Sequence, residues 1–297
     1  MACWEVVTLP NTIIKFVKET TNEVLYVGAG YDWRLQKNGL EGFAGFEANV
    51  STSEDYSRDG GTTDNIRLSD KDRTIKICNI NWRNNQTERA KAQRFFTYNT
   101  DYKIYITAEG VQRWVEGTLY RMQLNEPTDE DYLLKATISF HFDSPYLMSV
   151  DNFGRDIASL TPNFGFPWMS NISHGTAVGI FNFERSVMLR NDGDNIAYPK
   201  IVITFKAAVL NPVVSINEGF IRILGTFGVT DRITIDYTVN PPRIEDNGEN
   251  IMGICDRASD FDNMYILIGE NTVSFDADNG TDEMSVSVFY NRLYTVI

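Results

Sequence analysis

Short runs of β-branched and aromatic residues, separated by turn residues, occupy most of this sequence. Beyond residue 168, eight such runs follow one another, at 178–183, 187–190, 200–205, 220–224, 232–237, 264–268, 271–276 and 284–290. Turn signals such as Asn191-Asp-Gly-Asp-Asn, Asn240-Pro-Pro and Asn279-Gly stand between them. Many short strands with such punctuation, and no helical period between them, are typical of two antiparallel sheets over one core. The C-terminal half is therefore predicted to be an all-β sandwich.

The N-terminal half has the same kind of run with one interruption. Strands are predicted at 4–9, 12–17, 24–27, 73–80, 102–107, 113–124 and 132–142. Residues 87–99 begin at a capping Thr87, contain strong helix formers, and place Ala92, Phe95 and Phe96 at helical spacing, which predicts a helix. The polar and acidic stretch 51–64 is predicted to be a long exposed loop.

Prolines and aromatic residues between positions 143 and 168 separate the two halves. Pro145 ends the first half, and Pro162 and Pro167 bound an aromatic-rich segment. Because proline lacks a ladder donor and restricts the residue before it, strand pairing is broken repeatedly there. A chain of 297 residues usually forms two domains. We place them at 1–145 and 146–297.

Composition argues against several classes of protein. No segment offers about 20 consecutive apolar residues, so no membrane span is expected, and residues 1–16 lack the pattern of a signal peptide. Cys3, Cys78 and Cys255 are odd in number and far apart, which argues against a disulfide framework and a clustered metal site. The net charge of −13 disfavours nonspecific binding of nucleic acid, because an acidic surface repels phosphate.

Residues for nucleophilic catalysis or cofactor binding are not visible. The two histidines, His141 and His174, have no second His or Cys at ligand spacing, and the chain has no G-x-S-x-G elbow. Gly28-Ala-Gly30 lacks the third glycine and the helix of a dinucleotide-binding loop. We therefore predict no catalytic, cofactor-binding or metal-binding residues, no cofactor and no enzymatic activity.

Carboxylate clusters and tryptophans leave alternatives open. Asp256, Asp260 and Asp262, or the acids of segment 126–130, could supply the acid and base of a glycosidase, although 40 acidic residues produce such clusters by chance. Segment 276–283 is oxygen-rich like a calcium loop, but it lacks EF-hand spacing, and a hairpin tip explains it. The tryptophans could form a sugar-binding platform, although burial in the core is commoner; they are Trp4, Trp33, Trp82, Trp114 and Trp168.

The order of several segments along the chain is itself informative. In the first half they are 73–77, the helix near 89–96, 102–107, 114–119 and 138–146; in the second half they are 191–194, 198–203, 231–236, 244–250, 256–261 and 269–275. In this order they resemble the siphovirus tail component family, the distal tail proteins of long-tailed bacterial viruses. Residues 1–65 match this family less well. We interpret the glycine-rich, acidic insertion before Ile66 as an extra loop, and we assign it no role.

The resemblance implies a mainly β protein in two parts. An N-terminal β-structured belt domain with one helix would assemble as a hexameric ring, and a galectin-like β-sandwich would follow it. The belt's edge strands would pair or pack with those of the next copy.

The resemblance also implies a structural role without turnover chemistry. The ring would be a hub that connects the tail tube protein to a tal-like tail-tip protein and to receptor-binding proteins. DNA would cross its central channel without specific binding, which an acidic wall favours. The protein would be made in the host bacterial cytoplasm, carried in the virion, and would have no membrane partner. The alternatives are a carbohydrate-binding module for host glycans and a two-carboxylate glycosidase.

Overall fold

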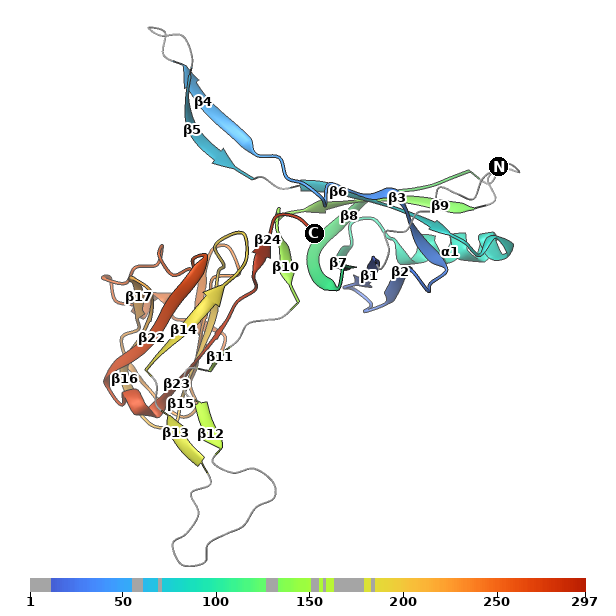
Figure 1. Cartoon of the computed structure of the whole chain (residues 1–297). Coiled ribbons are helices and arrows are strands. Elements are labelled where there is room, and N and C mark those ends of the chain that lie inside the picture. The colour runs from blue at the N-terminus through green and yellow to red at the C-terminus, as the bar shows by residue number, and fades with distance from the viewer. Residues whose placement is uncertain are drawn as a thin grey trace, which may run out of the picture. The chain divides into compact units, whose positions relative to one another are not determined.

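The computed structural model describes residues 12–54, 61–68, 71–126, 133–150, 155–156, 159–162, 179–182 and 185–297. The chain folds into two compact units (Figure 1). Unit 1 is Met1–Val150 together with Tyr294–Ile297, and unit 2 is Asp151–Leu293. The four residues Tyr294–Ile297, which the sequence placed in the second half, thus belong to unit 1. The assignment of the two halves as a belt domain and a galectin-like domain stays a prediction.

Unit 1 contains one sheet of nine strands. They are β1 (Ile13–Lys18), β2 (Val24–Gly28), β3 (Trp33–Glu41), β6 (Lys71–Asn79), β7 (Asp101–Ala108), β8 (Val111–Leu124), β9 (Leu134–Phe142), β10 (Leu147–Ser149) and β24 (Leu293–Tyr294). The main path runs β2-β1-β7-β8-β9-β6-β3, and β10 pairs with both β8 and β24. Six predicted strands of this half are confirmed with small shifts of their bounds; the strand predicted at 4–9 lies outside the described residues.

Alternation of side chains explains how this sheet forms its core. In β7, Tyr102, Ile104 and Ile106 are buried, while Lys103 and Tyr105 between them point to the other face. Helix α1 (Asn85–Phe95) adds Ala92 and Phe95 to the same core. The predicted helix is confirmed, but it begins before Thr87, because the 3-10 turn η2 (Trp82–Asn84) leads directly into it.

Two elements of unit 1 differ from the sequence prediction. Strand β3 was not predicted, because Asn38 has a positive φ of 55° and the pairing with β6 shifts between Leu35 and Leu40, which interrupts the alternation. The loop predicted at 51–64 is wrong, since β4 (Asn49–Glu54) and β5 (Gly61–Arg67) form an antiparallel hairpin. The hairpin lacks the alternation of apolar and polar residues that marks a strand in a sequence, but its β-branched threonines favour the extended conformation. Its predicted exposure is confirmed.

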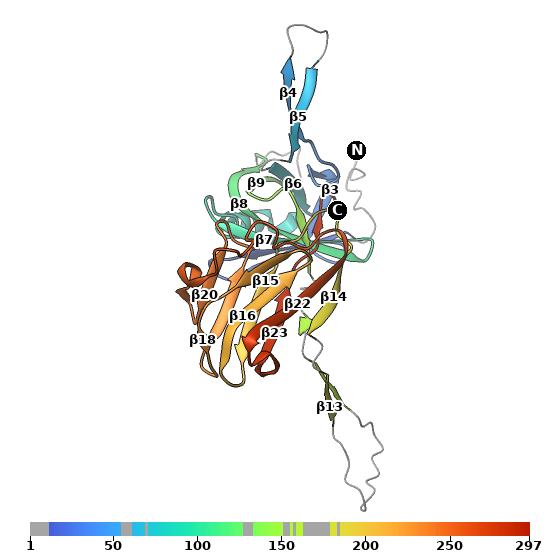
Figure 2. The ribbon, with the colours of Figure 1, turned by 90° about the vertical axis from the view of Figure 1, so that its left-hand side faces the viewer.

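Unit 2 contains two sheets over one core (Figure 2). The first has the order β11-β23-β15-β19-β20-β21, with β11 (Arg155–Asp156), β23 (Met284–Phe289), β15 (Lys200–Phe205), β19 (Arg232–Asp236), β20 (Arg243–Asp246) and β21 (Glu249–Asn250). The second has the order β14-β22-β16-β17 with β18 on β16, comprising β14 (Ser186–Asn191), β22 (Gly269–Asn279), β16 (Val209–Ile216), β17 (Gly219–Arg222) and β18 (Thr226–Phe227). Strands β12 (Ser159–Pro162) and β13 (Gly179–Asn182) pair separately.

The core of unit 2 takes side chains from both sheets. Ile201, Ile203 and Ile233 come from the first sheet, and Val214 and Val273 come from the second. The all-β prediction is therefore confirmed, and the chain is mainly β with one α-helix among the described residues. None of the helices in the described ranges is long and apolar enough to cross a membrane.

In unit 2 one predicted strand is wrong, and strand β16 was not predicted. Residues 264–268 form a single β-bridge, Ala197 to Ile266, and no named strand. Strand β16 was not predicted, because it contains Pro212 and because Asn211 has a positive φ of 50°, both of which are unusual inside a strand. The carbonyl of Pro212 nevertheless accepts a hydrogen bond from the N–H of Ile223, at 3.0 Å.

Candidate functional site

One edge of the unit 1 sheet is an apolar strand. Strand β2 pairs with β1 and with no other strand among those the structure describes. It contains no charged residue, and Val24 and Tyr26 are 43% and 39% exposed. Soluble proteins usually protect such edges with lysine, proline or a covering segment, because unpaired N–H and C=O groups recruit another strand. The β2 edge can therefore accept a strand from a partner.

The β4–β5 hairpin, which we call the arm, is a second unprotected element (Figure 1). Neither strand pairs with a third strand in the described part of the chain. Val50 stands directly opposite Ile66, and these side chains are 55% and 62% exposed. An isolated two-stranded hairpin is only marginally stable in water. The arm would therefore gain stability by packing on another surface.

A row of aromatic and cationic side chains crosses the face of the sheet away from the core. Tyr26, Lys15, Tyr105 and Trp114 stand opposite one another on successive strands. Lys15 lies over the Tyr105 ring at 5.2 Å, and the Tyr105 and Trp114 rings stack at 6.2 Å. The Trp114 indole N–H donates to the Ser149 carbonyl at 2.9 Å. These side chains are held by stacking, a cation–π contact and a hydrogen bond. Such mutual contacts are typical of a rigid surface and not of a reactive site.

Crowded carboxylates lie beside that row. Lys103 forms an ion pair with Glu19 at 2.6 Å. Burial, and next the charge of Glu19, raise the pKa of Glu116 above its ordinary value, although Lys103 acts in the opposite direction. No group of three or more His, Cys, Asp or Glu side chains in the described residues could hold a metal ion. The cluster is thus a set of ion pairs with excess negative charge.

His141 is placed between two carboxylates. Its Nδ1 is 2.8 Å from Asp72 Oδ1, and its Nε2 is 3.7 Å from Asp143 Oδ1. The Tyr120 hydroxyl donates to Asp72 at 3.4 Å. This arrangement stabilises the end of β9 through charged and polar contacts. His174 lies outside the described residues.

The carboxylates considered for glycosidase chemistry are engaged with the backbone. Asp256 accepts a hydrogen bond from the N–H of Ala258 at 3.0 Å. Asp260 accepts from the N–H groups of Asp262 and Asn263, both at 3.2 Å. Such contacts are typical of Asx turns, in which the side chain closes a loop. Residues 127–130 of the other cluster lie outside the described residues.

The calcium-like segment 276–283 is closed by protein groups. The carboxylate of Asp278 accepts hydrogen bonds from Arg222 and from Asn211 Nδ2. Asp276 accepts from the Thr281 hydroxyl at 3.0 Å. These contacts lower the pKa of Asp278, with the Asn211 hydrogen bond as the largest cause. The geometry favours the turn interpretation, since an arginine occupies the place where a cation would bind.

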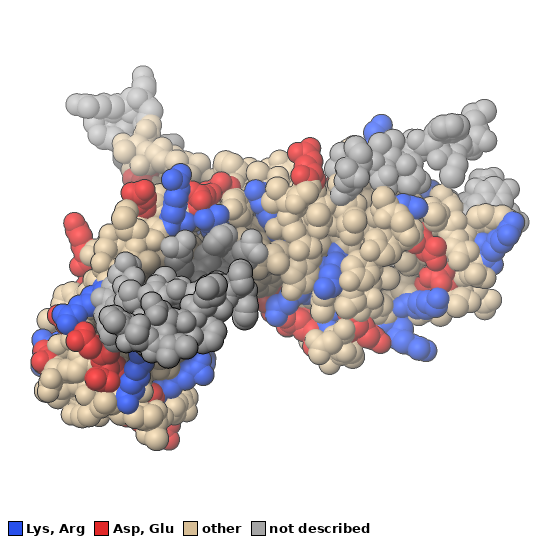
Figure 3. All heavy atoms as spheres, turned by 60° about the horizontal axis from the view of Figure 1, so that its bottom comes forward, with Lys and Arg blue, Asp and Glu red and all other residues tan. Residues whose placement is uncertain are grey.

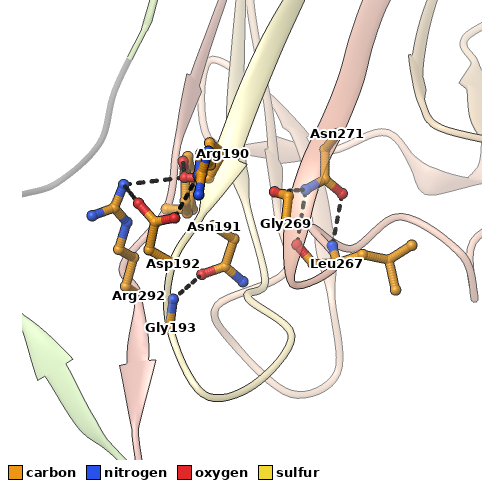
Figure 4. A network of polar contacts seen from close by, with 9 residues as sticks. Arg190, Asn191, Asp192, Gly193, Leu267, Gly269, Asn271 and Arg292 are labelled. Carbon is orange, nitrogen blue, oxygen red and sulfur yellow. Dashed lines mark hydrogen bonds and ion pairs between the residues drawn. The ribbon is translucent and has the colours of Figure 1, made fainter.

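Buried asparagines organise two loops of unit 2 (Figure 4). Asn191 accepts from the N–H of Gly193 at 3.0 Å and donates to the Asn195 carbonyl at 2.9 Å. Asn271 accepts from the N–H of Leu267 at 2.7 Å and donates to its carbonyl at 2.8 Å. The segment 191–195, which the sequence predicts as a turn, is held in that turn by its own first residue.

The described tryptophans and cysteines lie in the core or in contacts with other side chains. Trp33 is buried, Trp82 is exposed with Arg83 over its ring, and Trp114 belongs to the aromatic row. No two described tryptophans stack on one another, so these three do not build a shared sugar platform. Cys78 is buried and Cys255 is half-buried, and no disulfide joins them. Trp4, Trp168 and Cys3 lie outside the described residues.

Charges of both signs are interspersed on the face shown in Figure 3. Lys and Arg side chains stand among Asp and Glu, and no extended area of one sign covers this face. The chain thus has no concentrated basic surface there. The surfaces that distinguish it are the β2 edge and the arm. Sequence reasoning missed both, because edge strands and paired strands look alike in a sequence.

The fold is mainly β, is built from two units, and is similar to the folds of solved phage proteins. The SPP1 Dit protein (gp 19.1), described as a paradigm of the hub adsorption apparatus in phages infecting Gram-positive bacteria, has a TM-score of 0.63 at 12% identity, over 93% of this chain and 98% of that chain. Structures of the phage p2 baseplate in its activated conformation with Ca and with Sr have TM-scores of 0.51 and 0.52 at 11% identity, over 96% of this chain and 99% of those chains. These neighbours are described as parts of a phage adsorption apparatus and of a phage baseplate.

The sequence gives the more particular assignment. Residues 192–294 match the family model for the siphovirus-type tail component, C-terminal domain. No curated protein matches the chain. The resemblance inferred from the order of sequence segments is therefore confirmed: residues 192–294 have the sequence pattern of that domain, and nearly the whole chain has the fold of a Dit protein.

Proposed function

We propose that this protein is a structural component of a phage tail, a distal tail hub whose copies form a hexameric ring. The observation that carries the proposal is the likeness to a Dit protein over nearly the whole length of both chains. The family match of residues 192–294 supports it independently through the sequence. The protein would act by binding neighbours and would catalyse no reaction.

The strand contacts that would build the ring come from unit 1. The β2 edge of one copy would be an apolar acceptor for a strand, and the arm of the next copy would supply two strands that pair with no third strand in the described ranges. A contact between two unlike surfaces is heterologous. Repeated from copy to copy, it forms a closed ring when the rotation between neighbouring copies is a whole-number fraction of 360°. Main-chain hydrogen bonds would supply affinity, and exposed side chains such as Tyr26 and Ile66 would supply specificity.

The proposed ring lies between the tail tube and the tail tip. Its other partners would be the tail tube protein, a tal-like tail-tip protein and receptor-binding proteins, and DNA would pass through its channel without specific binding. The protein would be made in the host bacterial cytoplasm and carried in the virion. The acidic composition favours passage of DNA, since like charges repel.

Native mass spectrometry and electron microscopy of the purified protein test the ring. We expect a particle with six times the mass of the chain and a central hole. The variants Tyr26→Lys and Ile66→Lys place a charge on the two surfaces and should shift the population to monomers, with an unchanged circular dichroism spectrum. Val229→Lys makes the same change at an exposed position of unit 2 and should leave the ring intact. A chain that stays monomeric even with its tail tube and tail-tip proteins would contradict the proposal.

A further inference from the structure

A buried arginine of unit 1 has two N–H groups without hydrogen-bond partners. Arg73 lies on β6 and is 1% exposed. Its Nη2 donates to the Pro145 carbonyl, whereas its Nε and Nη1 are buried and bond to none of the described residues. Buried polar groups in proteins almost always have a partner, which is a protein group, a water molecule or an ion. These two N–H groups therefore indicate a site for a small acceptor.

Positive charge dominates this site. Lys71 lies two residues before Arg73 on the same strand, and the pKa of Lys71 is lowered first by burial and next by the charge of Arg73. Glu47 raises that pKa, but it is the smallest of the three causes. Burial lowers the pKa of Arg73 to about 10, and no described carboxylate forms an ion pair with it. In a chain of net charge −13, two neighbouring cations of this kind attract an anion.

Apolar groups close the site to solvent. The Arg73 guanidinium lies 4.9 Å from the Phe43 ring centre and 5.1 Å from the Phe142 ring centre, and both rings are fully buried. A Cβ on Gly42 would lie 3.2 Å from Arg73 Cγ, so the backbone after β3 also packs against the arginine. Such walls favour a monatomic ion over sulfate or a carboxylate side chain, which would have to push them apart.

We propose that Arg73, with Lys71 beside it, binds a small monovalent anion such as chloride in unit 1. The anion would accept hydrogen bonds from Nε and Nη1, and its charge would offset that of the buried guanidinium. A water molecule could accept the same hydrogen bonds but would leave the charge uncompensated. Lys71 Nζ donates to the Gly45 carbonyl at 2.6 Å, so Lys71 would act through its charge. This inference does not depend on ring formation.

Thermal unfolding at constant ionic strength tests the site in solution. Sodium chloride replaces sodium gluconate stepwise up to about 300 mM, and tryptophan fluorescence reports on unit 1, which holds four of the five tryptophans. An anion that binds only the folded chain should raise the melting temperature by about 2–4 °C. Arg73→Met should abolish this rise, and Lys71→Met should require about threefold more chloride for half of it. Arg121→Met removes an exposed cation of unit 1 and should keep the full rise.

Crystals of the wild-type chain grown in sodium bromide locate the anion, so this test does not require Arg73→Met to fold. Bromide replaces chloride, and its anomalous signal should lie within hydrogen-bond distance of Arg73 Nε or Nη1. A water molecule at that place would overturn the proposal, as would an equal rise of the melting temperature in the wild type and in Arg73→Met. Bromide beside Arg73 without any rise in solution would indicate an adventitious ion only and would also refute it.

Discussion

Arg73 is a buried cation that has no carboxylate partner among the residues that the structure describes. Its guanidinium lies 4.9 Å from the Phe43 ring centre and 5.1 Å from that of Phe142, and one nitrogen donates to the Pro145 carbonyl. The Nε and Nη1 groups are buried without hydrogen-bond partners. Burial lowers the pKa of this arginine to about 10. Burying this charge costs a large desolvation free energy. Among the described residues, only the contacts with the two rings and one hydrogen bond offset that cost.

Two substitutions separate the packing of Arg73 from its charge. Arg73→Met keeps most of the volume and removes the buried cation, so the free energy of unfolding should change by less than about 1 kcal/mol or should rise. Arg73→Ala leaves a cavity between the two rings and should lose about 2–4 kcal/mol. Urea unfolding followed by circular dichroism measures both. A larger loss for Met than for Ala would contradict this account.

Glu116 gives a prediction with a defined pH dependence. Its pKa is raised by burial and by Glu19, so the charged form is less favourable in the folded state. A carboxyl group of this kind stabilises the fold less as pH rises from its unfolded pKa through its folded pKa. Glu116→Gln should therefore raise the free energy of unfolding at pH 7 by a few tenths to about 1 kcal/mol, because solvent screens part of the effect.

The gain from Glu116→Gln should disappear below about pH 4, where the wild-type carboxyl is protonated in both states. Urea unfolding at pH 7 and at pH 3.5 measures this difference. Glu218→Gln, at an exposed turn of unit 2, is the control and should change little at either pH. A gain that is equal at both pH values would contradict the assigned cause.

Turns between strands are the elements whose geometry the sequence predicts best. Asn279-Gly280 predicts a turn at a hairpin tip, and the structure has a turn there, the 3-10 helix η4 (Thr281–Glu283). The hairpin itself is wrong, because β22 and β23 on either side of the turn belong to different sheets. Gly280 has a φ of 80°, and a Cβ on it would lie 2.6 Å from the Ala208 carbonyl oxygen. Both the backbone conformation and the close approach require glycine.

Gly280→Ala should therefore destabilise unit 2 by about 2–3 kcal/mol, since strain and a backbone clash add. Gly248→Ala is the matched control: Gly248 has a φ of 90°, but nothing lies within 4 Å of its Cβ position. It should lose only about 1 kcal/mol. Thermal unfolding of both variants measures the difference. Equal losses of unfolding free energy in the two variants would contradict a role for the clash with Ala208, because they would show that a small backbone shift relieves it.

Strands that alternate cleanly were predictable, and strands with irregular backbone were not. Lys103 and Tyr105 alternate with the buried residues of β7, so that strand was found from its period. The bulge at Asn38 and the Asn211-Pro212 pair break the period in β3 and β16, and only partner strands reveal these elements. The edge position of β2 depends on the order of strands in the sheet, which no local pattern encodes. The same limit hid the contacts of residues 294–297, because they depend on Arg113 and Phe43, which are distant in the sequence.

At the scale of the whole molecule, the two units should respond differently to acid. Among the described residues, the carboxylates whose pKa is lowered are Asp192, Asp236 and Asp278, and all three lie in unit 2. The Arg190 hydrogen bond is the largest cause for Asp192. For Asp236, burial alone would raise the pKa, but hydrogen bonds from Thr238 and Lys200 outweigh it. A lowered carboxyl pKa stabilises the fold above the unfolded pKa, and this is lost as pH falls through the folded value.

Unit 2 should therefore lose stability below about pH 4, where these aspartates begin to bind protons in the unfolded chain. In unit 1, Glu116 acts in the opposite direction, because burial and next the charge of Glu19 raise its pKa, so that its protonated form is favoured in the folded state. Hydrogen exchange between pH 5 and pH 2.5, corrected for the intrinsic exchange rate, should show β15 and β19 opening before β7 and β8. Asp236→Asn removes one of these groups and should make unit 2 less stable at pH 7 but less sensitive to acid. If unit 1 opens first, the balance of charges assigned to the two units is wrong.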